Sequence, residues 1–276
     1  MFQPDLLAGK RVLVTGGGTG LGRAIAHRYA ELGASLVLCG RRGEVLAATA
    51  AEITAATGAK VDAQTCDIRS GEAVEAMMER IWRDGPLDIL VNNAAGNFLA
   101  RTQLLSHRAI DAVLNTVLHG AAYCTIACGR RWIAEGRPGA VLSILTLSAL
   151  QGAPFTAPSA MAKAGVLAMT RSLAVEWGRH GIRLVAVAPG SFPTPGAWKQ
   201  LMPEERQKAP LDRSIPLGRH GEHAELANLC AFLVSDQAGY ITGEAVVIDG
   251  GKRFLGGAGP SELLAWTDAQ WDALRA

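Results

Sequence analysis

Short apolar segments alternate with longer amphipathic segments along the chain. The short segments are rich in Val, Leu and Ile and are apolar almost throughout, as in a parallel sheet that is buried on both faces. They predict strands at Arg11–Thr15, Ser35–Cys39, Lys60–Gln64, Leu87–Val91, Ala140–Ile144, Arg183–Ala188 and Ala245–Ile248. The longer segments predict helices at Leu21–Leu32, Glu44–Thr57, Glu72–Arg83, Ile110–Glu135, Pro158–Arg179 and Glu222–Val234. We therefore expect an α/β fold with a doubly wound, seven-stranded parallel sheet and helices on both faces.

No linker rich in Pro, Ser or charge divides the chain, so we expect a single domain over residues 1–276. Two segments differ from the rest. Gly190–Leu217 contains five prolines and follows the sixth predicted strand, at the sheet edge where ligands bind in such folds. We expect a substrate loop there, around 190–217. The tail, 254–276, carries Trp266 and Trp271, which we expect to pack on the body or on a neighbouring subunit.

Charge and composition exclude several classes of partner. Lys and Arg number 27 against 25 Asp and Glu, so no global charge favours nucleic acid or an anionic membrane. No uninterrupted run of 18 apolar residues occurs, and the opening MFQPDLLAGK does not resemble a signal peptide, so we expect no membrane association. The five cysteines are odd in number and include no CxxC, which favours reduced cytoplasm and no metal site.

A glycine-rich turn joins the first predicted strand to the first helix. Val12–Thr15 leads directly into Gly16-Gly17-Gly18-Thr19-Gly20-Leu21-Gly22. Backbone N–H groups of such a turn hold a pyrophosphate, and a Cβ would block its close approach. The spacing is GxxxGxG, not the commoner GxGxxG. Its place in a βαβ unit predicts a Rossmann-type dinucleotide site, with cofactor contacts from Gly16, Gly18, Thr19, Gly20 and Leu21.

The end of the second predicted strand indicates which dinucleotide is bound. NAD binders usually place Asp or Glu there, to hold the ribose 2′-hydroxyl. This chain has Cys39-Gly40-Arg41-Arg42 instead. A guanidinium group binds phosphate oxygens in a bidentate way, so Arg41 and Arg42 predict NADP(H) as the cofactor. The alternative, a solvated helix start, applies more to Arg42 than to Arg41.

Further motifs follow the later strands: Asp67 with Ile68, Asn92-Asn93-Ala94-Ala95-Gly96, and Pro189-Gly190. With the glycine-rich turn, they resemble the short-chain dehydrogenase/reductase family from about Leu7 to Gly251. The resemblance implies that Asp67 contacts the adenine, and that such enzymes assemble as homotetramers. It also implies cofactor contacts from Ile68, Asn93, Ala94, Gly96, Pro189, Gly190 and Phe192.

Other stretches are similar to the 2,4-dienoyl-CoA reductases of that family, which use NADPH to reduce a conjugated dienoyl thioester. They are AAGNF at 94–98, PSAMAKAG at 158–165 and QWD at 270–272. The resemblance implies that Asn97 holds the thioester oxygen and that Ser159 and Lys163 hold the nicotinamide ribose. It places three residues on the acyl-CoA side: Arg69, Phe98 and Ser106.

The usual acid of the wider family is missing. Its YxxxK motif is Ser159 and Lys163 here, and the i,i+4 spacing keeps both side chains on one helix face. A serine hydroxyl is a far weaker acid than a phenol, so interconversion of alcohol and ketone is disfavoured. Related reductases carry a tyrosine at the position of Ser148, or an acidic residue near Val117. The chain's tyrosines are elsewhere, at positions 29, 123 and 240.

Three groups could replace the missing acid. Ser148 could hold a water that donates the proton, and Thr146 ends the fifth predicted strand close by. His119 has a suitable pKa range, but it lies roughly 200° round the helix from Val117. Reduction of a conjugated thioester needs mainly oxyanion stabilisation, which Asn97 and a water on Ser148 could supply.

We therefore expect an NADPH-dependent reductase of an enoyl- or dienoyl-CoA thioester, with Asn97, Ser148, Ser159 and Lys163 as catalytic residues. Two alternatives stay open: a short-chain reductase of another carbonyl substrate, such as a 3-ketoacyl compound, and a catalytically silent NADPH-binding protein.

Overall fold

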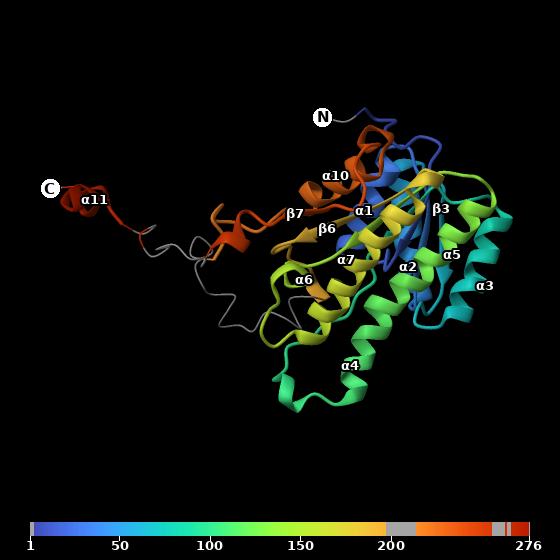
Figure 1. The fold of residues 1–276 in the computed structure, drawn as a ribbon. Coiled ribbons are helices and arrows are strands. Elements are labelled where there is room, and N and C mark those ends of the chain that lie inside the picture. Colours follow the sequence, from blue (N-terminus) through green and yellow to red (C-terminus); the bar gives the residue numbers. More distant parts are fainter. Residues whose placement is uncertain (1–2, 197–213, 256–262, 264–265, 276) are drawn as a thin grey trace.

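One sheet of seven parallel strands organises the chain. The computed structural model describes residues 3–196, 214–255, 263 and 266–275. Its strands are β1 (Arg11–Thr15), β2 (Ser35–Gly40), β3 (Val61–Thr65), β4 (Ile89–Asn92), β5 (Gly139–Ile144), β6 (Ile182–Pro189) and β7 (Ala245–Ile248). The order is β3-β2-β1-β4-β5-β6-β7, so the winding reverses between β1 and β4 (Figure 1). The predicted fold class is confirmed.

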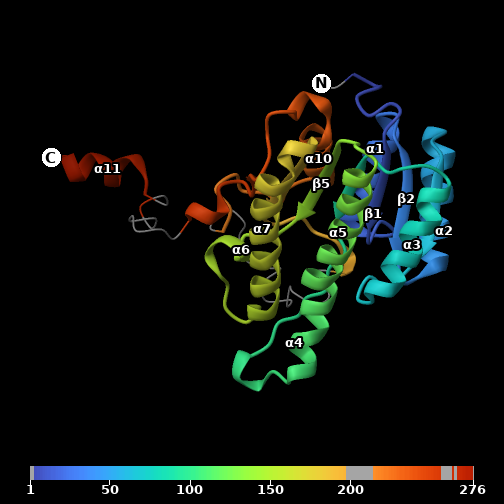
Figure 2. The same ribbon diagram turned by 45° about the vertical axis from the view of Figure 1, so that its right-hand side comes forward.

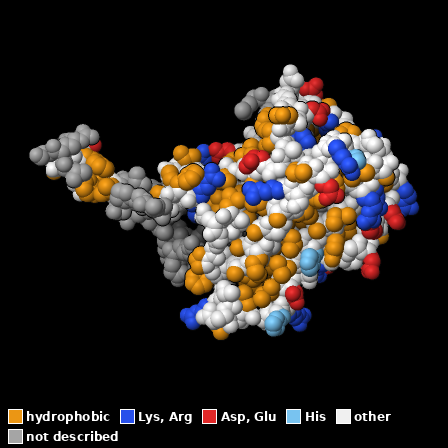
Figure 3. All heavy atoms as spheres, in the orientation of Figure 1, with side chains coloured by type: hydrophobic (Ala, Val, Ile, Leu, Met, Phe, Trp, Pro, Cys, Tyr) orange, Lys and Arg blue, Asp and Glu red, His pale blue; other side chains and the backbone are white. Residues whose placement is uncertain are grey.

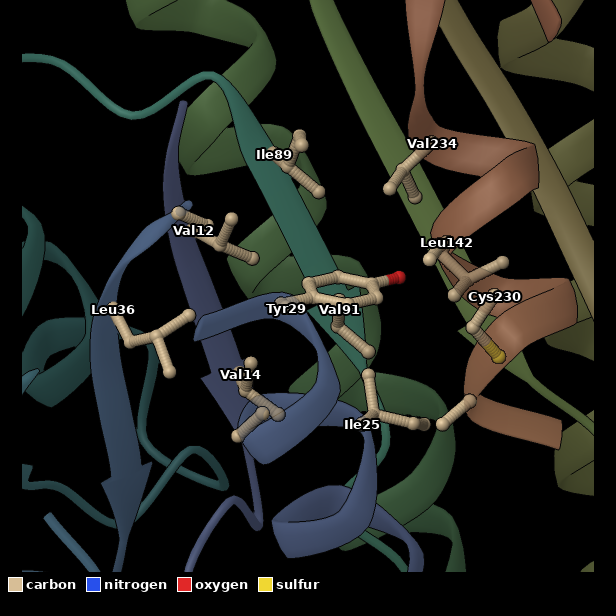
Figure 4. Close-up of a cluster of buried hydrophobic side chains, with 14 of the residues drawn as sticks. Val12, Val14, Ile25, Tyr29, Leu36, Ile89, Val91, Leu142, Cys230 and Val234 are labelled. Carbon is tan, nitrogen blue, oxygen red and sulfur yellow. The ribbon is translucent and has the colours of Figure 1, made fainter. Parts of the chain in front are cut away.

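Helices cover both faces of the sheet, which explains why the strands are apolar almost throughout. On one face lie α1 (Gly20–Glu31), α2 (Gly43–Thr57) and α10 (His223–Val234). Figure 4 shows Ile25 and Tyr29 of α1 packed between the strand residues and Cys230 of α10. The other face is covered by α3 (Gly71–Arg83), α5 (Gly120–Ala134) and α7 (Ala157–Trp177). Alternate residues of one strand serve the two cores, because side chains in a strand point to opposite faces.

The longest predicted helix begins earlier than expected and is interrupted. It consists of α4 (His107–Leu114), a π-helical turn (Asn115–His119) and α5. Ser106 starts α4 because its hydroxyl accepts a hydrogen bond from the N–H of Ala109 at 3.2 Å. By length and composition, His107–Ala134 could cross a membrane, with a mean hydropathy of 1.2. Half of the apolar 18-residue stretch to which this hydropathy applies is buried inside the protein. Helix α5 packs against α3, α7 and the sheet (Figure 2).

The carboxyl ends of the strands form one edge of the sheet, next to α6 (Ser148–Gln151). Of the predicted substrate loop, residues 197–213 lie outside the described part of the chain. In the tail, α11 (Asp268–Arg275) stands away from the body in both views. Trp266 and Trp271 pack on each other there, with ring centroids 5.2 Å apart. Among the described residues, the two tryptophans therefore form a ring contact with one another in the tail.

Candidate active site

The glycine-rich turn lies at the end of β1, where the winding of the sheet reverses. Gly16 and Gly20 have φ angles of +65° and +56°, which residues with a Cβ rarely adopt. Helix α1 begins at Gly20 with no side-chain cap on its N-terminus and no acidic residue in its first turn. The backbone N–H groups there are oriented to receive an anion. These residues fit the pyrophosphate of a dinucleotide.

Thr15 joins the glycine-rich turn to the segment that follows β4. Its hydroxyl accepts hydrogen bonds from the N–H groups of Asn93 and Ala94, at 3.0 and 3.1 Å. Asn93 Nδ2 donates to the Thr15 carbonyl oxygen at 3.0 Å. Gly22 packs so closely here that a Cβ would overlap both Asn93 Nδ2 and the Gly16 carbonyl. Two predicted cofactor segments are thus locked together, whereas Gly96 lies exposed in the following loop.

Three charged residues gather beyond β2 and β3, where the adenosine end of a dinucleotide is expected. Arg69 Nε donates to Asp67 Oδ1 at 2.9 Å. This hydrogen bond lowers the pKa of Asp67, and the nearby charge of Arg41 adds a smaller effect in the same direction. Arg41 is exposed, and Arg42 occupies the position just before α2. The structure therefore places Arg69, which the resemblance assigns to the substrate, beside two predicted cofactor residues.

Ser159 and Lys163 lie one turn apart on α7, and both are buried. Lys163 Nζ donates to the carbonyl oxygen of Ile144, the last residue of β5. Burial lowers the pKa of Lys163 to about 8. The side chain borders a small cavity of about 10 Å³, about the space of one water molecule, lined also by Ile68, Asn92 and Val117. Val117, near whose position the resemblance implies an acidic residue, thus lines the cavity at Lys163 with an apolar side chain.

The hydroxyl groups of Thr146 and Ser148 form a pair at the carboxyl end of β5. Their oxygens lie 2.5 Å apart, and either can be the donor. The sequence marks both residues as candidates without indicating that they touch, because their contact depends on the turn that starts α6. The structure therefore brings Thr146 into direct contact with Ser148, one of the predicted catalytic residues.

Asn97 and Phe98 lie in the loop after β4. The side-chain oxygen of Asn97 accepts the N–H of Phe98 at 2.9 Å, so this hydrogen bond does not engage the NH₂ group of Asn97. Phe98 packs against Val117 and Ala162, next to Lys163. Ser106 is exposed, and its hydroxyl caps α4.

The tyrosines and His119 occupy other surroundings. Tyr29 is completely buried among the residues of α1 and α10, and Tyr240 is fully exposed. His119 Nδ1 bonds to Asn115 Oδ1 at 2.8 Å, and its ring faces Tyr123. None of these four is among the described residues that line the cavity at Lys163. Within the described part of the chain, no three His, Cys, Asp or Glu side chains gather as a metal site would require.

The segment after β6 lies at the carboxyl ends of the strands, next to β7 and the glycine-rich turn. Pro189 ends β6, and the N–H of Gly190 donates to Ile248 of β7 at 2.8 Å. Thr194 lies against the glycine-rich turn, because a Cβ on Gly20 would come within 3.3 Å of its methyl group. No sequence motif at Thr194 predicts this contact.

The chain is similar to several known proteins. A family model described as enoyl-(acyl carrier protein) reductase matches residues 16–253. A Caenorhabditis elegans protein named "Probable 2,4-dienoyl-CoA reductase 3" is 42% identical, over 98% of this chain and 90% of its own length. A Bacillus subtilis (strain 168) protein named "Probable 2,4-dienoyl-CoA reductase" is 41% identical, over 88% of this chain and 96% of its own.

A solved structure shows the same architecture with a cofactor bound. The gluconate 5-dehydrogenase of Burkholderia cenocepacia J2315, in complex with NADP and tartrate, is 29% identical. It superposes with a TM-score of 0.85, over 91% of this chain and 98% of its own. Family model, relatives and fold agree with the motifs at the sheet edge: the chain belongs to the short-chain dehydrogenase/reductase family of nicotinamide-dependent oxidoreductases.

Proposed function

We propose that this protein uses NADPH to reduce a conjugated enoyl- or dienoyl-CoA thioester. The observation that carries the proposal is the buried Ser159–Lys163 pair, with hydroxyl groups at Thr146 and Ser148 and no tyrosine among the described residues that line the cavity at Lys163. A ketone needs a general acid, ordinarily a phenol, beside its oxygen as hydride arrives. A conjugated thioester needs its oxygen held while charge develops, which weaker donors can do. The donor set therefore suits the thioester better.

Each residue then has a defined task. The bound dinucleotide would supply the hydride. Asn97 would donate its amide N–H to the thioester oxygen. The Thr146–Ser148 pair would hold a water that gives a second hydrogen bond to this oxygen and then the proton that, together with the hydride, completes the reduction. Ser159 and Lys163 would hold the ribose from α7, and Phe98 would form the apolar wall next to Ala162.

We also propose that the chain works as a homotetramer, as the family resemblance suggests. Figure 3 shows apolar side chains gathered on the face over α5 and α7. Exposed apolar residues of these helices include Tyr123, Ile126, Met161 and Val175. Light scattering on the purified chain would give the number of subunits, and a monomer would refute the proposal.

The function is tested by NADPH oxidation with a panel of substrates. The panel contains a 2,4-dienoyl-CoA, a 2-enoyl-CoA, a 3-ketoacyl thioester and a free ketone. We expect turnover with the conjugated thioesters and little with the ketone. Activity on ketones without activity on conjugated thioesters would favour a reductase of another carbonyl substrate.

A Ser148→Tyr variant separates a weak enzyme from a silent one. We expect the bulky phenol to lower an existing thioester reductase activity, because it would replace the partner of Thr146. If the wild-type protein is inactive and Ser148→Tyr creates turnover, the natural chain is a silent NADPH-binding protein.

Changing Arg41 to Glu is expected to reverse the preference for NADPH over NADH. A guanidinium–phosphate contact contributes about 1.5–3 kcal/mol, so the Kd for NADPH should rise about tenfold or more. The Kd for NADH should change little. Fluorescence titration with both cofactors measures this, and Arg83→Glu, at an exposed arginine in the last turn of α3, is the matched control. Equal losses for NADPH and NADH would remove Arg41 from the 2′-phosphate site.

A further inference from the structure

The loop after β6 is hydrogen bonded to the residues that lead into α10. The N–H of Gly221 donates to the Ser191 carbonyl at 3.0 Å. His220 Nδ1 lies 2.8 Å from Ser191 Oγ. His223 Nε2 lies 2.7 Å from the Pro193 carbonyl oxygen, and must be the donor because that oxygen can only accept. Two histidine side chains thus hold two neighbouring points of one loop.

The segment that carries these histidines is itself fixed. Arg219 forms a bidentate ion pair with Glu225, at 2.8 and 2.7 Å. Glu225 also accepts the N–H of Glu222 at 2.8 Å, which closes a capping box at the start of α10. The hydrogen bonds from Arg219 lower the pKa of Glu225 to about 2, so this carboxylate stays charged at neutral pH.

The same segment is joined to the helix that starts at the glycine-rich turn. Arg28 of α1 donates through Nε to Asn228 of α10 at 2.8 Å. The backbone of Gly221 packs directly against the ring of Phe192, because a Cβ on Gly221 would overlap that ring. The loop therefore has a firm support on the side of α10.

The residue after Pro193 is Thr194, which lies against Gly20 at the first turn of α1. The position of Thr194 over the glycine-rich turn is thus set through Pro193 and His223. Asp67 and Arg41 mark the adenosine end beyond β2 and β3. A dinucleotide that spans the point where the winding reverses must place its nicotinamide half on the β6 side.

We propose that His220 and His223 are positioning residues that hold Ser191–Thr194 against the glycine-rich turn and thereby fit the site to the nicotinamide half of the cofactor. The inference rests on the cofactor part of the proposed function and not on the identity of the substrate. Neither histidine needs to touch the cofactor. Their effect passes through the Ser191 and Pro193 contacts.

The test compares the whole cofactor with its adenosine half. NADPH and adenosine 2′,5′-bisphosphate are titrated into the wild type and into His220→Ala and His223→Ala. One lost hydrogen bond corresponds to about a three- to tenfold change in Kd. We expect the Kd for NADPH to rise by that factor in each variant, with no change for the adenosine fragment. His220→Asn and His223→Gln keep a side-chain N–H at the matching place and should restore NADPH binding to within about twofold.

His180→Ala is the matched control, because its ring lies at the opposite edge of the sheet beside Arg179. Three results would overturn the inference: unchanged NADPH binding in both alanine variants, equal losses for NADPH and the fragment, or no rescue by Asn and Gln. If the wild type prefers NADH, the same pattern with NADH and AMP supports the histidine role, while the NADP assignment fails. Thermal melting of each variant shows that it is folded.

Discussion

Replacing Lys163 with methionine is expected to lower kcat/KM for the conjugated thioester by at least about 100-fold. Lys163 is buried beside the cavity at the sheet edge, and its ammonium group holds the end of β5 through the Ile144 carbonyl. Methionine keeps the apolar stem but removes the charge and all three donors. Because burial disfavours the charged form, the variant should remain folded, with a melting temperature close to that of the wild type.

The control for this change is Lys60→Met, which removes an exposed lysine near Asp62. We expect full activity from that variant. Turnover by Lys163→Met within a few fold of the wild type would refute the assignment of the site to this edge of the sheet.

The same lysine predicts a pH dependence. Its pKa is lowered to about 8, so the ammonium is present below pH 8 and lost as the pH rises through that value. If the ammonium holds the ribose, kcat/KM should be highest below about pH 8 and should fall above it. Since kcat/KM reports the free enzyme, the profile is to be measured at low substrate concentration. A flat profile from pH 7 to 9.5 would contradict the role of the charge.

Changing Gly22 to Ala is expected to destabilise the protein by about 1–3 kcal/mol. The new Cβ would overlap Asn93 Nδ2 and the Gly16 carbonyl, both of which belong to the junction at Thr15. The sign of the change in unfolding free energy is informative, because Gly→Ala inside a helix ordinarily stabilises a protein by roughly 0.5–1 kcal/mol. Urea denaturation measures the change, and a cofactor titration should show weaker binding as the turn is displaced.

Gly178→Ala is the matched control. Gly178 follows α7 with a φ of −55°, and nothing lies within 4 Å of a Cβ built there. That variant should be as stable as the wild type or slightly more stable. Equal stability of the two alanine variants would show that the junction between the turn and Asn93 is loose.

The sequence predicts all seven strands to within a few residues. The central strands are apolar at nearly every position because both of their faces are buried, whereas β3 at the edge of the sheet is mixed polar and partly exposed. It also locates the glycine-rich turn, since a positive φ at Gly16 and Gly20 and the packing at Gly22 demand glycine. The longest helix is less well predicted. Its π-helical turn at Asn115–His119 has no counterpart in the hydrophobic period.

The sequence by itself determined the sheet, its helices and the dinucleotide turn, because local periodicity and backbone geometry specify them. Only the tertiary structure decided which side chains meet: Thr146 with Ser148, Arg69 with Asp67 near Arg41, and His223 with Pro193. The first two pairs are only two residues apart and depend on the local turn, whereas Arg41 and Asp67, and His223 and Pro193, come from different segments that the sheet brings to one edge. Distances between such groups depend on strand order and register, which no pattern within a single segment encodes.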